Sequence, residues 1–266
     1  MILLAIAPNG ARITKEDLPN IPLTAEEIGL EAKACQQAGA GMIHLHVRNK
    51  KGGHSLNEEL YKAAIQQIRE QTDDQLFIQL TSESVGKYSS DEQFEMIHHL
   101  KPEGVSIGIR EIKDMDELDI NEHFNWMRDN QVYPQLILYN QHDLEIYKKW
   151  LKGGVIPGKA YPLLLVIGKH HAEGFFETDL LEENLDLSAS SWMICAFGAQ
   201  EYSAGKRAAE LGGHIRLGLE NNHLLEDGSN AKNNAEIVEQ MASHLKSKGE
   251  KLASYQDACK IMRPGW

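Results

Sequence analysis

The chain has 266 residues, of which 42% are hydrophobic and 25% are charged, and its formal net charge at pH 7 is −12. This composition is that of an ordinary globular protein, and the length fits one α/β barrel of about 250 residues. The acidic balance argues against a general nucleic-acid-binding protein, because neutralising phosphates requires a basic face. An anionic substrate remains open, provided that basic residues gather in one pocket.

The cysteines and the N-terminal residues indicate the cellular compartment in which we expect the protein. Cys35, Cys195 and Cys259 are an odd number, widely spaced and without a CxxC pair, which favours reduced thiols over a disulfide framework. The apolar residues 1–7 lack a basic segment and run into a Pro-Asn-Gly turn, so we interpret them as a buried strand rather than a signal peptide. No apolar run approaches the length that a bilayer requires. We therefore expect a cytoplasmic protein that does not enter a membrane.

Short apolar runs alternate with amphipathic segments along the whole chain, a pattern typical of parallel strands covered by helices. Strands are predicted at residues 2–7, 41–47, 75–81, 104–109, 132–139, 162–167, 191–196 and 214–219. Helices are predicted near residues 24–38, 56–70, 89–99, 116–129, 142–151, 178–184, 198–210 and 231–247, with a last one at 255–262. Two helix starts have the spacing of a capping box: Thr24 with Glu27, and Ser90 with Gln93.

Eight strand-then-helix units without a long linker predict a single (β/α)8-barrel domain, the TIM barrel, over residues 1–266. An open doubly wound sheet is the alternative. No GxGxxG or GxxxxGK[ST] segment follows any predicted strand, which argues against that fold and against a nucleotide cofactor. In a barrel, functional residues lie on the loops after the C-terminal ends of the strands.

Two histidines and a carboxylate meet this rule. His44 and His46 end the second predicted strand, where residues i and i+2 point to the same face. Glu220 stands at the end of the eighth, and in a closed barrel the second and eighth strands both flank the first. Two imidazoles and one carboxylate are a common catalytic zinc set that leaves one position open for substrate. We therefore hypothesise a divalent metal, zinc, bound by His44, His46 and Glu220.

Two alternatives compete with this metal site. The two histidines could be core side chains whose hydrogen bonds are satisfied within the barrel. The pair His170 and His171, just after the sixth predicted strand, is the rival pair at the functional rim.

Several stretches resemble the β-keto acid cleavage enzymes, a family that includes 3-keto-5-aminohexanoate cleavage enzyme. They are APNGA at residues 7–11, HLHVR at 44–48 and GGHIRLGLE at 212–220. The likeness continues through NNAEIV at 233–238 and covers nearly the whole chain, most loosely between about 110 and 190. HxHxR on the second strand together with GGHxRxGLE on the eighth is a specific combination.

The resemblance implies a zinc-dependent (β/α)8 barrel that forms a homo-oligomer. Its partners would be small molecules: members exchange an acyl group between a β-keto acid and acetyl-CoA, giving acetoacetate and a new acyl-CoA. It also implies a role for six residues. His44, His46 and Glu220 match the metal ligands, Arg216 matches an arginine that supports the carboxylate chemistry, and Thr81 and Ser82 match hydroxyl residues of the substrate site.

Two departures from the family's pattern bear on the chemistry. Asn221 stands where members carry an Asp that is proposed to act as base, and an amide cannot accept a proton at neutral pH. Arg12 stands where some members carry a Glu that recognises a substrate amino group. Arginine there would repel an ammonium group and attract a carboxylate. The base could then be Glu83, Asp143 or a hydroxide on the metal.

Three functions remain open from the sequence. The first is metal-dependent acyl exchange between a β-keto acid and a CoA thioester, with Arg216 and Asn221 as catalytic residues and Arg12, Thr81 and Ser82 in the substrate site. The second is a metal-dependent barrel hydrolase, although amidohydrolases place their HxH on the first strand. The third is a metabolite-binding relative that kept the metal and lost its base at Asn221.

Overall fold

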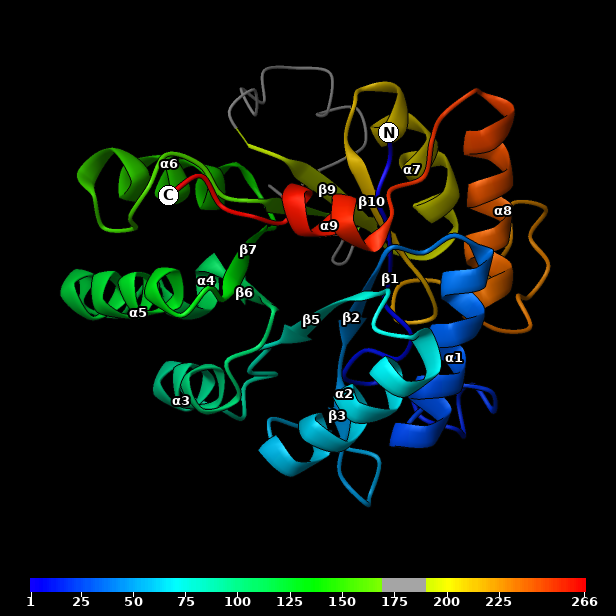
Figure 1. The fold of residues 1–266 in the computed structure, drawn as a ribbon, viewed down its shortest axis with the longest axis horizontal. Coiled ribbons are helices and arrows are strands. Elements are labelled where there is room, and N and C mark those ends of the chain that lie inside the picture. The colour runs from blue at the N-terminus through cyan, green and yellow to red at the C-terminus, as the bar shows by residue number, and fades with distance from the viewer. Residues whose placement is uncertain (169–189) are drawn as a thin grey trace.

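The computed structural model describes residues 1–168 and 190–266. Within these residues, eight parallel strands close into a barrel whose order follows the sequence, with β1 lying between β2 and β10 (Figure 1). The predicted (β/α)8 barrel is therefore confirmed. The strands are β1 (Leu4–Ile6), β2 (Met42–Leu45), β5 (Phe77–Thr81), β6 (Gly104–Gly108), β7 (Tyr133–Leu138), β8 (Leu163–Ile167), β9 (Trp192–Ala196) and β10 (His214–Leu217).

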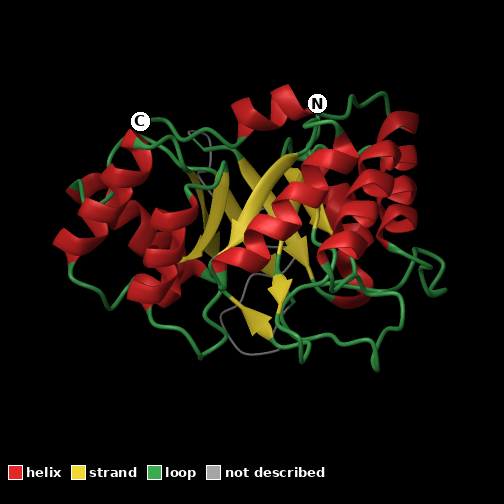
Figure 2. Ribbon diagram, turned by 60° about the horizontal axis from the view of Figure 1, so that its bottom comes forward, coloured by secondary structure: helices red, strands yellow, loops and turns green. Residues whose placement is uncertain are grey.

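Helices surround the strands, as Figure 2 shows. They follow the predicted positions closely, except that the helix predicted at 178–184 lies outside the described residues. The long helices are α1 (Ala25–Ala38), α2 (Glu58–Thr72), α3 (Ser90–Leu100), α5 (Glu117–Asp129), α6 (Gln141–Gly153), α7 (Glu201–Glu210), α8 (Asn234–Ser247) and the shorter α9 (Tyr255–Ile261). A 3₁₀ turn at Gly198–Gln200 precedes α7.

One of the two predicted capping boxes is correct and one is wrong. Thr24 and Glu27 form the box that begins α1. At α3 the N-cap is Ser89, whose hydroxyl accepts the N–H of Glu92 while the Glu92 carboxylate accepts the N–H of Ser89. Ser90 is already the first helical residue. The prediction was wrong by one position because Ser89 and Ser90 are adjacent and either could be the N-cap.

Two short elements were not predicted, and both follow barrel strands. The hairpin of β3 (Val47–Arg48) and β4 (His54–Ser55) comes after β2, and α4 (Ile109–Ile112) comes after β6. The predicted strand 41–47 thus ends earlier, at Leu45. The predicted strand 214–219 ends at Leu217, because Gly218 has φ +132° and a Cβ there would lie 2.6 Å from the carbonyl oxygen of Ala7.

The alternation of side chains divides the barrel interior into two layers. At the N-terminal end the interior is apolar, and α9 closes it by packing Ala258 and Met262 there (Figure 1). Toward the C-terminal end the inward positions are polar and buried. The apolar residues include Leu3, Met42, Phe77, Leu164 and Met193, and the polar ones include His44, Gln79, Ser106, Gln135 and Arg216. The fold therefore puts its buried polar groups at the functional end.

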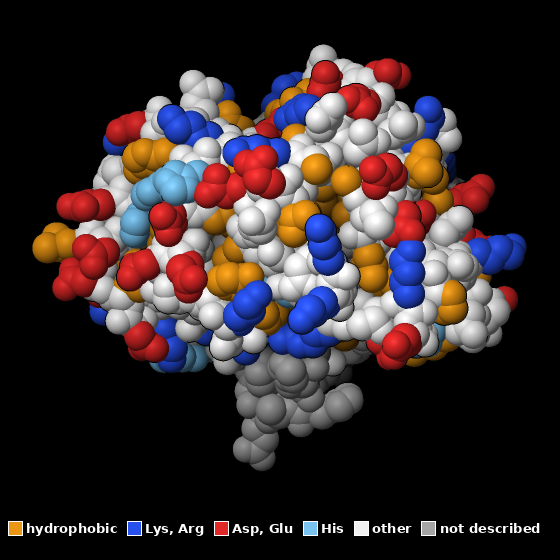
Figure 3. All heavy atoms as spheres, turned by 90° about the horizontal axis from the view of Figure 1, so that it is seen from below, with side chains coloured by type: hydrophobic (Ala, Val, Ile, Leu, Met, Phe, Trp, Pro, Cys, Tyr) orange, Lys and Arg blue, Asp and Glu red, His pale blue; other side chains and the backbone are white. Residues whose placement is uncertain are grey.

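Among the described residues, none of the helices combines the length and the apolar character needed to cross a membrane. The surface is mixed in charge. Figure 3 looks from below Figure 1, the side on which the β3–β4 hairpin lies, and several Lys and Arg side chains gather near the middle of this face. The loops that follow β1, β2 and β5 carry the exposed cations Arg12, Lys15, Lys50, Lys51 and Lys87.

His214, the first residue of β10, supplies a test of the fold. Its Nδ1 accepts the N–H of Leu3 at 3.2 Å, and burial, with the nearby N-terminal ammonium group, lowers its pKa to about 4. A histidine pKa below its unfolded value stabilises the protein above pH 6.5, and this stability is lost as the pH falls toward 4. We expect His214→Asn to destabilise the protein at pH 7 by up to about 3 kcal/mol, with the difference from wild type shrinking as the pH falls to 4. Calorimetric unfolding across this pH range measures it, and a constant difference would contradict the assignment.

Candidate active site

The predicted metal ligands converge at the C-terminal end of the barrel. Nε2 of His44 lies 3.1 Å from Nε2 of His46, and Oε2 of Glu220 lies 3.9 Å and 3.5 Å from these two nitrogens. Among the described residues, these three side chains form the one group of at least three potential metal ligands whose ligand atoms lie within 4.8 Å of one another. His44 comes from β2, His46 from the residue between β2 and β3, and Glu220 from the turn after β10. The rival pair, His170 and His171, lies outside the described residues.

The polar atoms of this cluster suit a cation. Both imidazoles are buried, and Oε2 of Glu220 is buried without a hydrogen-bond partner. Burial, followed by the neighbouring charges of His44, His54 and the arginines, lowers the pKa of His46 well below its ordinary value, so His46 is neutral near pH 7. A neutral imidazole offers a nitrogen lone pair. The donor set and the unpaired carboxylate oxygen therefore fit a divalent metal such as zinc.

Gln79 orients one of the two histidines. It stands beside His44 in the β2–β5 register, and its Oε1 lies 2.8 Å from Nδ1 of His44. An amide oxygen only accepts, so Nδ1 carries the hydrogen and Nε2 keeps its lone pair for a metal. Gln79 is held in turn by Gln135, whose Oε1 accepts from its Nε2 at 2.9 Å. The interior of the barrel thus selects the tautomer that a metal ligand needs.

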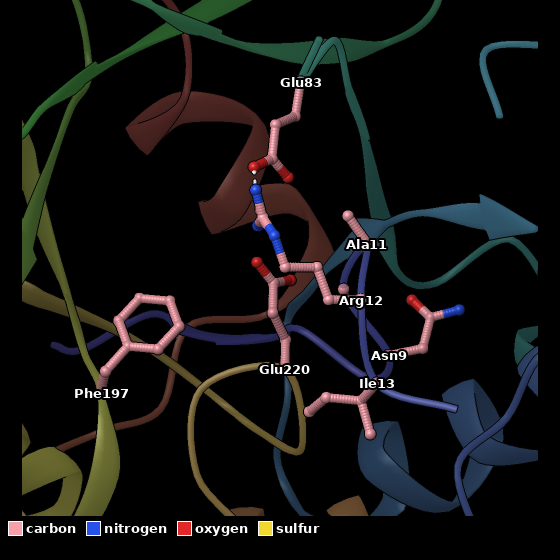
Figure 4. Close-up of a pocket in the computed structure, with 8 residues that line it drawn as sticks. Asn9, Ala11, Arg12, Ile13, Glu83, Phe197 and Glu220 are labelled. Atoms are coloured by element: carbon pink, nitrogen blue, oxygen red, sulfur yellow. Dashed lines mark hydrogen bonds and ion pairs between the residues drawn. The ribbon is translucent and has the colours of Figure 1, made fainter. Parts of the chain in front are cut away.

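Two adjoining cavities give access to the cluster. The inner one has a volume of about 20 Å³, room for about one ion or water, and the outer one has about 310 Å³. Glu83 and Glu220 line both. The inner cavity is further lined by His44, His46, Thr81, Ser106, Gly108, Glu111, Ile137, Tyr139 and Arg216, and the outer one by residues 9–13 and Phe197 (Figure 4).

Arg216 borders the inner cavity with two free donors. Its side chain is 4% exposed, and its Nη2 lies 3.1 Å from Sγ of Cys195 and 3.5 Å from Oε1 of Glu220. Its Nε and Nη1 are buried and have no hydrogen-bond partner. A buried guanidinium with unpaired N–H groups can donate hydrogen bonds to an anionic group such as a carboxylate.

Arg12 lies at the outer rim, on the loop after β1. Its side chain is 65% exposed, and its Nη1 lies 3.3 Å from Oε1 of Glu83. In Figure 4 the Arg12 side chain runs between the carboxylates of Glu83 and Glu220. Arg12 therefore borders the outer cavity as the sequence predicts, and Glu83 is its ion-pair partner.

Of the two predicted hydroxyl residues, the structure brings only Thr81 to a described cavity. Ser82 turns away and donates to the carbonyl oxygen of Ser106 at 2.8 Å. Ser106 itself was not predicted, yet it lines the inner cavity and its hydroxyl has no hydrogen-bond partner. Its signal in the sequence is a single polar residue within the apolar run Val105-Ser106-Ile107.

Asn221 does not line either cavity. Its Oδ1 accepts the thiol hydrogen of Cys195 at 3.2 Å, and its Nδ2 donates to Oε1 of Glu201 at 3.4 Å. Glu201 also escaped prediction. It is buried, and this burial raises its pKa to about 8 against the lowering effect of its hydrogen bonds and of Arg216. A carboxyl group at the start of a helix is common in sequences, so nothing marked Glu201 as special.

The other carboxylates near the site differ in whether they line a cavity and in which hydrogen bonds they accept. Asp143 lines neither cavity, and its Oδ2 accepts the backbone N–H of Tyr139 at 2.8 Å. Glu111 lines the inner cavity, but both of its oxygens accept hydrogen bonds, from Ser84 and from Gln93. Glu83 lines both cavities, and its Oε1 pairs with Arg12.

A substitution at Gly10 tests whether Glu220 is a metal ligand. Gly10 has φ +56°, and a Cβ there would lie 2.5 Å from Cγ of Glu220. Gly10→Ala should displace that carboxylate and weaken metal binding by about tenfold or more, measured by competition with a chelator. Gly228→Ala is the control, because Gly228 has φ +83° but nothing within 4 Å of its Cβ position. Equal metal affinity in the two variants would exclude Glu220 as a ligand.

Comparison with known proteins identifies the family. A family profile described as beta-keto acid cleavage enzyme matches residues 1–263. The 3-keto-5-aminohexanoate cleavage enzyme of Acetoanaerobium sticklandii is 31% identical over 269 residues, which cover 98% of this chain and 97% of that protein. The 3-oxoadipate:acetyl-CoA acetyltransferase of Cupriavidus necator is 23% identical, covering 96% and 92%.

Solved structures agree on the fold. The ternary complex of ObcA with a C4-CoA adduct and oxalate superimposes with a TM-score of 0.70 at 14% identity, covering 92% of this chain and 67% of that one. The type I 3-dehydroquinate dehydratase of Clostridium difficile gives 0.60 at 11% identity, covering 93% of each. With the profile matching nearly its whole length, the chain belongs to the β-keto acid cleavage enzyme family.

Proposed function

We propose that the protein exchanges an acyl group between a β-keto acid and acetyl-CoA, giving acetoacetate and a new acyl-CoA. The observation that carries this proposal is the buried cluster of His44, His46 and Glu220 beside the two unpaired donors of Arg216. Such a site offers a metal for the keto group of a β-keto acid and a cation for its carboxylate. The family and the names of the relatives support the same chemistry.

We propose zinc as the metal, held by His44, His46 and Glu220, because two imidazole nitrogens and a carboxylate oxygen are a donor set that zinc favours. When bound, zinc would supply a Lewis acid that polarises the keto group of the substrate. The protein's own contribution is orientation: Gln79 fixes the ring of His44, and burial keeps His46 neutral.

The Arg216 guanidinium is proposed to bind the substrate carboxylate. Its Nη1 has no hydrogen-bond partner within the protein and can donate to a carboxylate oxygen. Thr81 and Ser106 border the same cavity and offer hydroxyl groups to the substrate. Ser82 would act indirectly, by holding β5 to β6 through the Ser106 carbonyl group.

Glu83 is proposed as the group that takes the proton. Replacing one acyl group by another on the α-carbon of a β-keto acid requires that carbon to lose a proton first. Asn221 is an amide outside both cavities, and Glu111 and Asp143 are committed to other hydrogen bonds. Glu83 lines both cavities and is held by an exposed arginine, Arg12, that a bound anion can draw away.

Three further proposals complete the description. We propose that residues 1–266 form one domain, that the protein is cytoplasmic, and that it assembles as a homo-oligomer. Cys35 and Cys195 are buried and form no disulfide, which agrees with a reducing compartment. We propose no nucleic-acid partner, because the net charge is −12.

The direct test is to incubate the zinc-loaded protein with a panel of β-keto acids and acetyl-CoA and to detect new acyl-CoA products by mass. We expect acetoacetate and one new acyl-CoA in equal amounts. Release of free acid and CoA instead would indicate a hydrolase, and binding of keto acids without turnover would indicate a metabolite-binding relative. His44→Ala should remove both metal and turnover.

The charge of Arg12 predicts the substrate class. We expect β-keto acids with a second carboxylate, of which 3-oxoadipate is one, to be preferred over amino-substituted ones, because Arg12 repels an ammonium group. Arg12→Glu should raise KM for the dicarboxylate about tenfold. Arg128→Glu is the control, because Arg128 is an exposed arginine on α5 that pairs with Asp129. A lower KM for an amino-substituted keto acid in the unmodified protein would contradict this prediction.

A further inference from the structure

A buried carboxyl group lies behind the turn that carries Glu220. Glu201 begins α7 and is 3% exposed. Its Oε1 accepts hydrogen bonds from the backbone N–H of Gly218 at 3.0 Å and from Nδ2 of Asn221 at 3.4 Å. Its Oε2 accepts from Nδ2 of Asn222 at 3.4 Å. Three donors converge on a side chain that lines neither cavity, so its role is to hold other groups in place.

A chain of hydrogen bonds joins Glu201 to Arg216. Nη2 of Arg216 donates to Sγ of Cys195 at 3.1 Å, and the Cys195 thiol donates to Oδ1 of Asn221 at 3.2 Å. Asn221 then donates to Glu201. The strand register supports this chain, because Arg216 on β10 and Cys195 on β9 are paired residues. Every link has the same direction, from guanidinium to thiol to amide to carboxyl.

We propose that Glu201 is a positioning residue, which through Asn221 and Cys195 holds Nη2 of Arg216 and so orients the guanidinium, whose unpaired Nη1 is then available to the substrate carboxylate. This inference rests on the proposed role of Arg216 in binding that carboxylate. It also explains the amide at position 221. The position needs one acceptor for Cys195 and one donor for Glu201, and an amide side chain offers both where a carboxylate offers only acceptors.

The first test compares single variants by their dissociation constant for acetoacetate, measured by titration calorimetry on zinc-loaded and metal-free protein. We expect Glu201→Gln and Cys195→Ala to weaken acetoacetate binding about tenfold in both forms, with zinc content unchanged. Cys195→Ser should bind nearly as the wild type does, because a hydroxyl can both accept from Arg216 and donate to Asn221.

Two matched controls separate positioning from general stability. Cys35→Ala removes an equally buried thiol between the barrel and its helices, and Glu103→Gln removes a carboxylate that holds Ile78 and Tyr255 at the other end of the barrel. Both should leave acetoacetate affinity unchanged whatever their Tm. If Glu201→Gln folds poorly, the Cys195→Ala and Cys195→Ser pair carries the test alone.

The second test exchanges the two groups. Asn221→Asp alone places a second carboxylate about 3.4 Å from Glu201, and it should lower Tm and weaken acetoacetate binding. The double variant Glu201→Gln/Asn221→Asp again pairs one amide with one carboxylate. It should therefore recover most of the lost Tm and most of the lost acetoacetate affinity. A double-mutant cycle measures this coupling between the two positions.

The outcomes separate this inference from the proposed function. Coupled losses of affinity in a protein that performs no exchange would support the positioning role and refute the exchange reaction. Normal exchange with KM unchanged in Glu201→Gln and in Cys195→Ala would refute the positioning role alone. A double variant no better than Asn221→Asp, or a wild type that does not bind acetoacetate, would overturn the inference.

Discussion

The constraint on which the site depends is the burial of a positive charge at Arg216. When a guanidinium group is removed from water, neighbouring groups must accept its hydrogen bonds and compensate its charge. Nη2 is paired within the protein, with Cys195 and at longer range with Glu220, whereas Nε and Nη1 are buried without a hydrogen-bond partner. These unpaired donors are the basis of the proposed role of Arg216 in binding the substrate carboxylate.

The same reasoning connects the inner site with the outer rim. The protein is acidic overall, with a net charge of −12, yet the loops after β1, β2 and β5 place exposed cations at the C-terminal side of the barrel. Arg12 is one of them and is held by Glu83 at 3.3 Å. An exposed ion pair of this kind contributes little stability, so exchanging it for a substrate carboxylate costs little. This low cost supports the proposed role of Arg12 in substrate binding.

The sequence predicted the parts of the molecule that depend on local pattern. Short apolar runs between amphipathic segments were enough for the eight strands, and HxH with the later Glu220 was enough for the cluster, because barrel closure brings those strands together. The hairpin of β3 and β4 escaped because each strand has only two residues. Ser106 and Glu201 escaped for another reason: their importance comes from neighbours that are distant in the sequence. Ser82 illustrates the converse error, since a hydroxyl at a matching position turned toward the backbone instead of the cavity.

The amide at position 221 and the carboxyl group of Glu201 are best understood together. Two carboxylates within about 3.4 Å in a buried place repel each other, so an acid at either position favours an amide at the other. In this protein the acid stands on α7, one layer behind the turn, and the amide stands beside Glu220. A carboxyl group in that rear layer can hold Arg216 but cannot reach a substrate. The proposed proton acceptor therefore belongs to a different part of the barrel, at Glu83, which borders both cavities and pairs with Arg12.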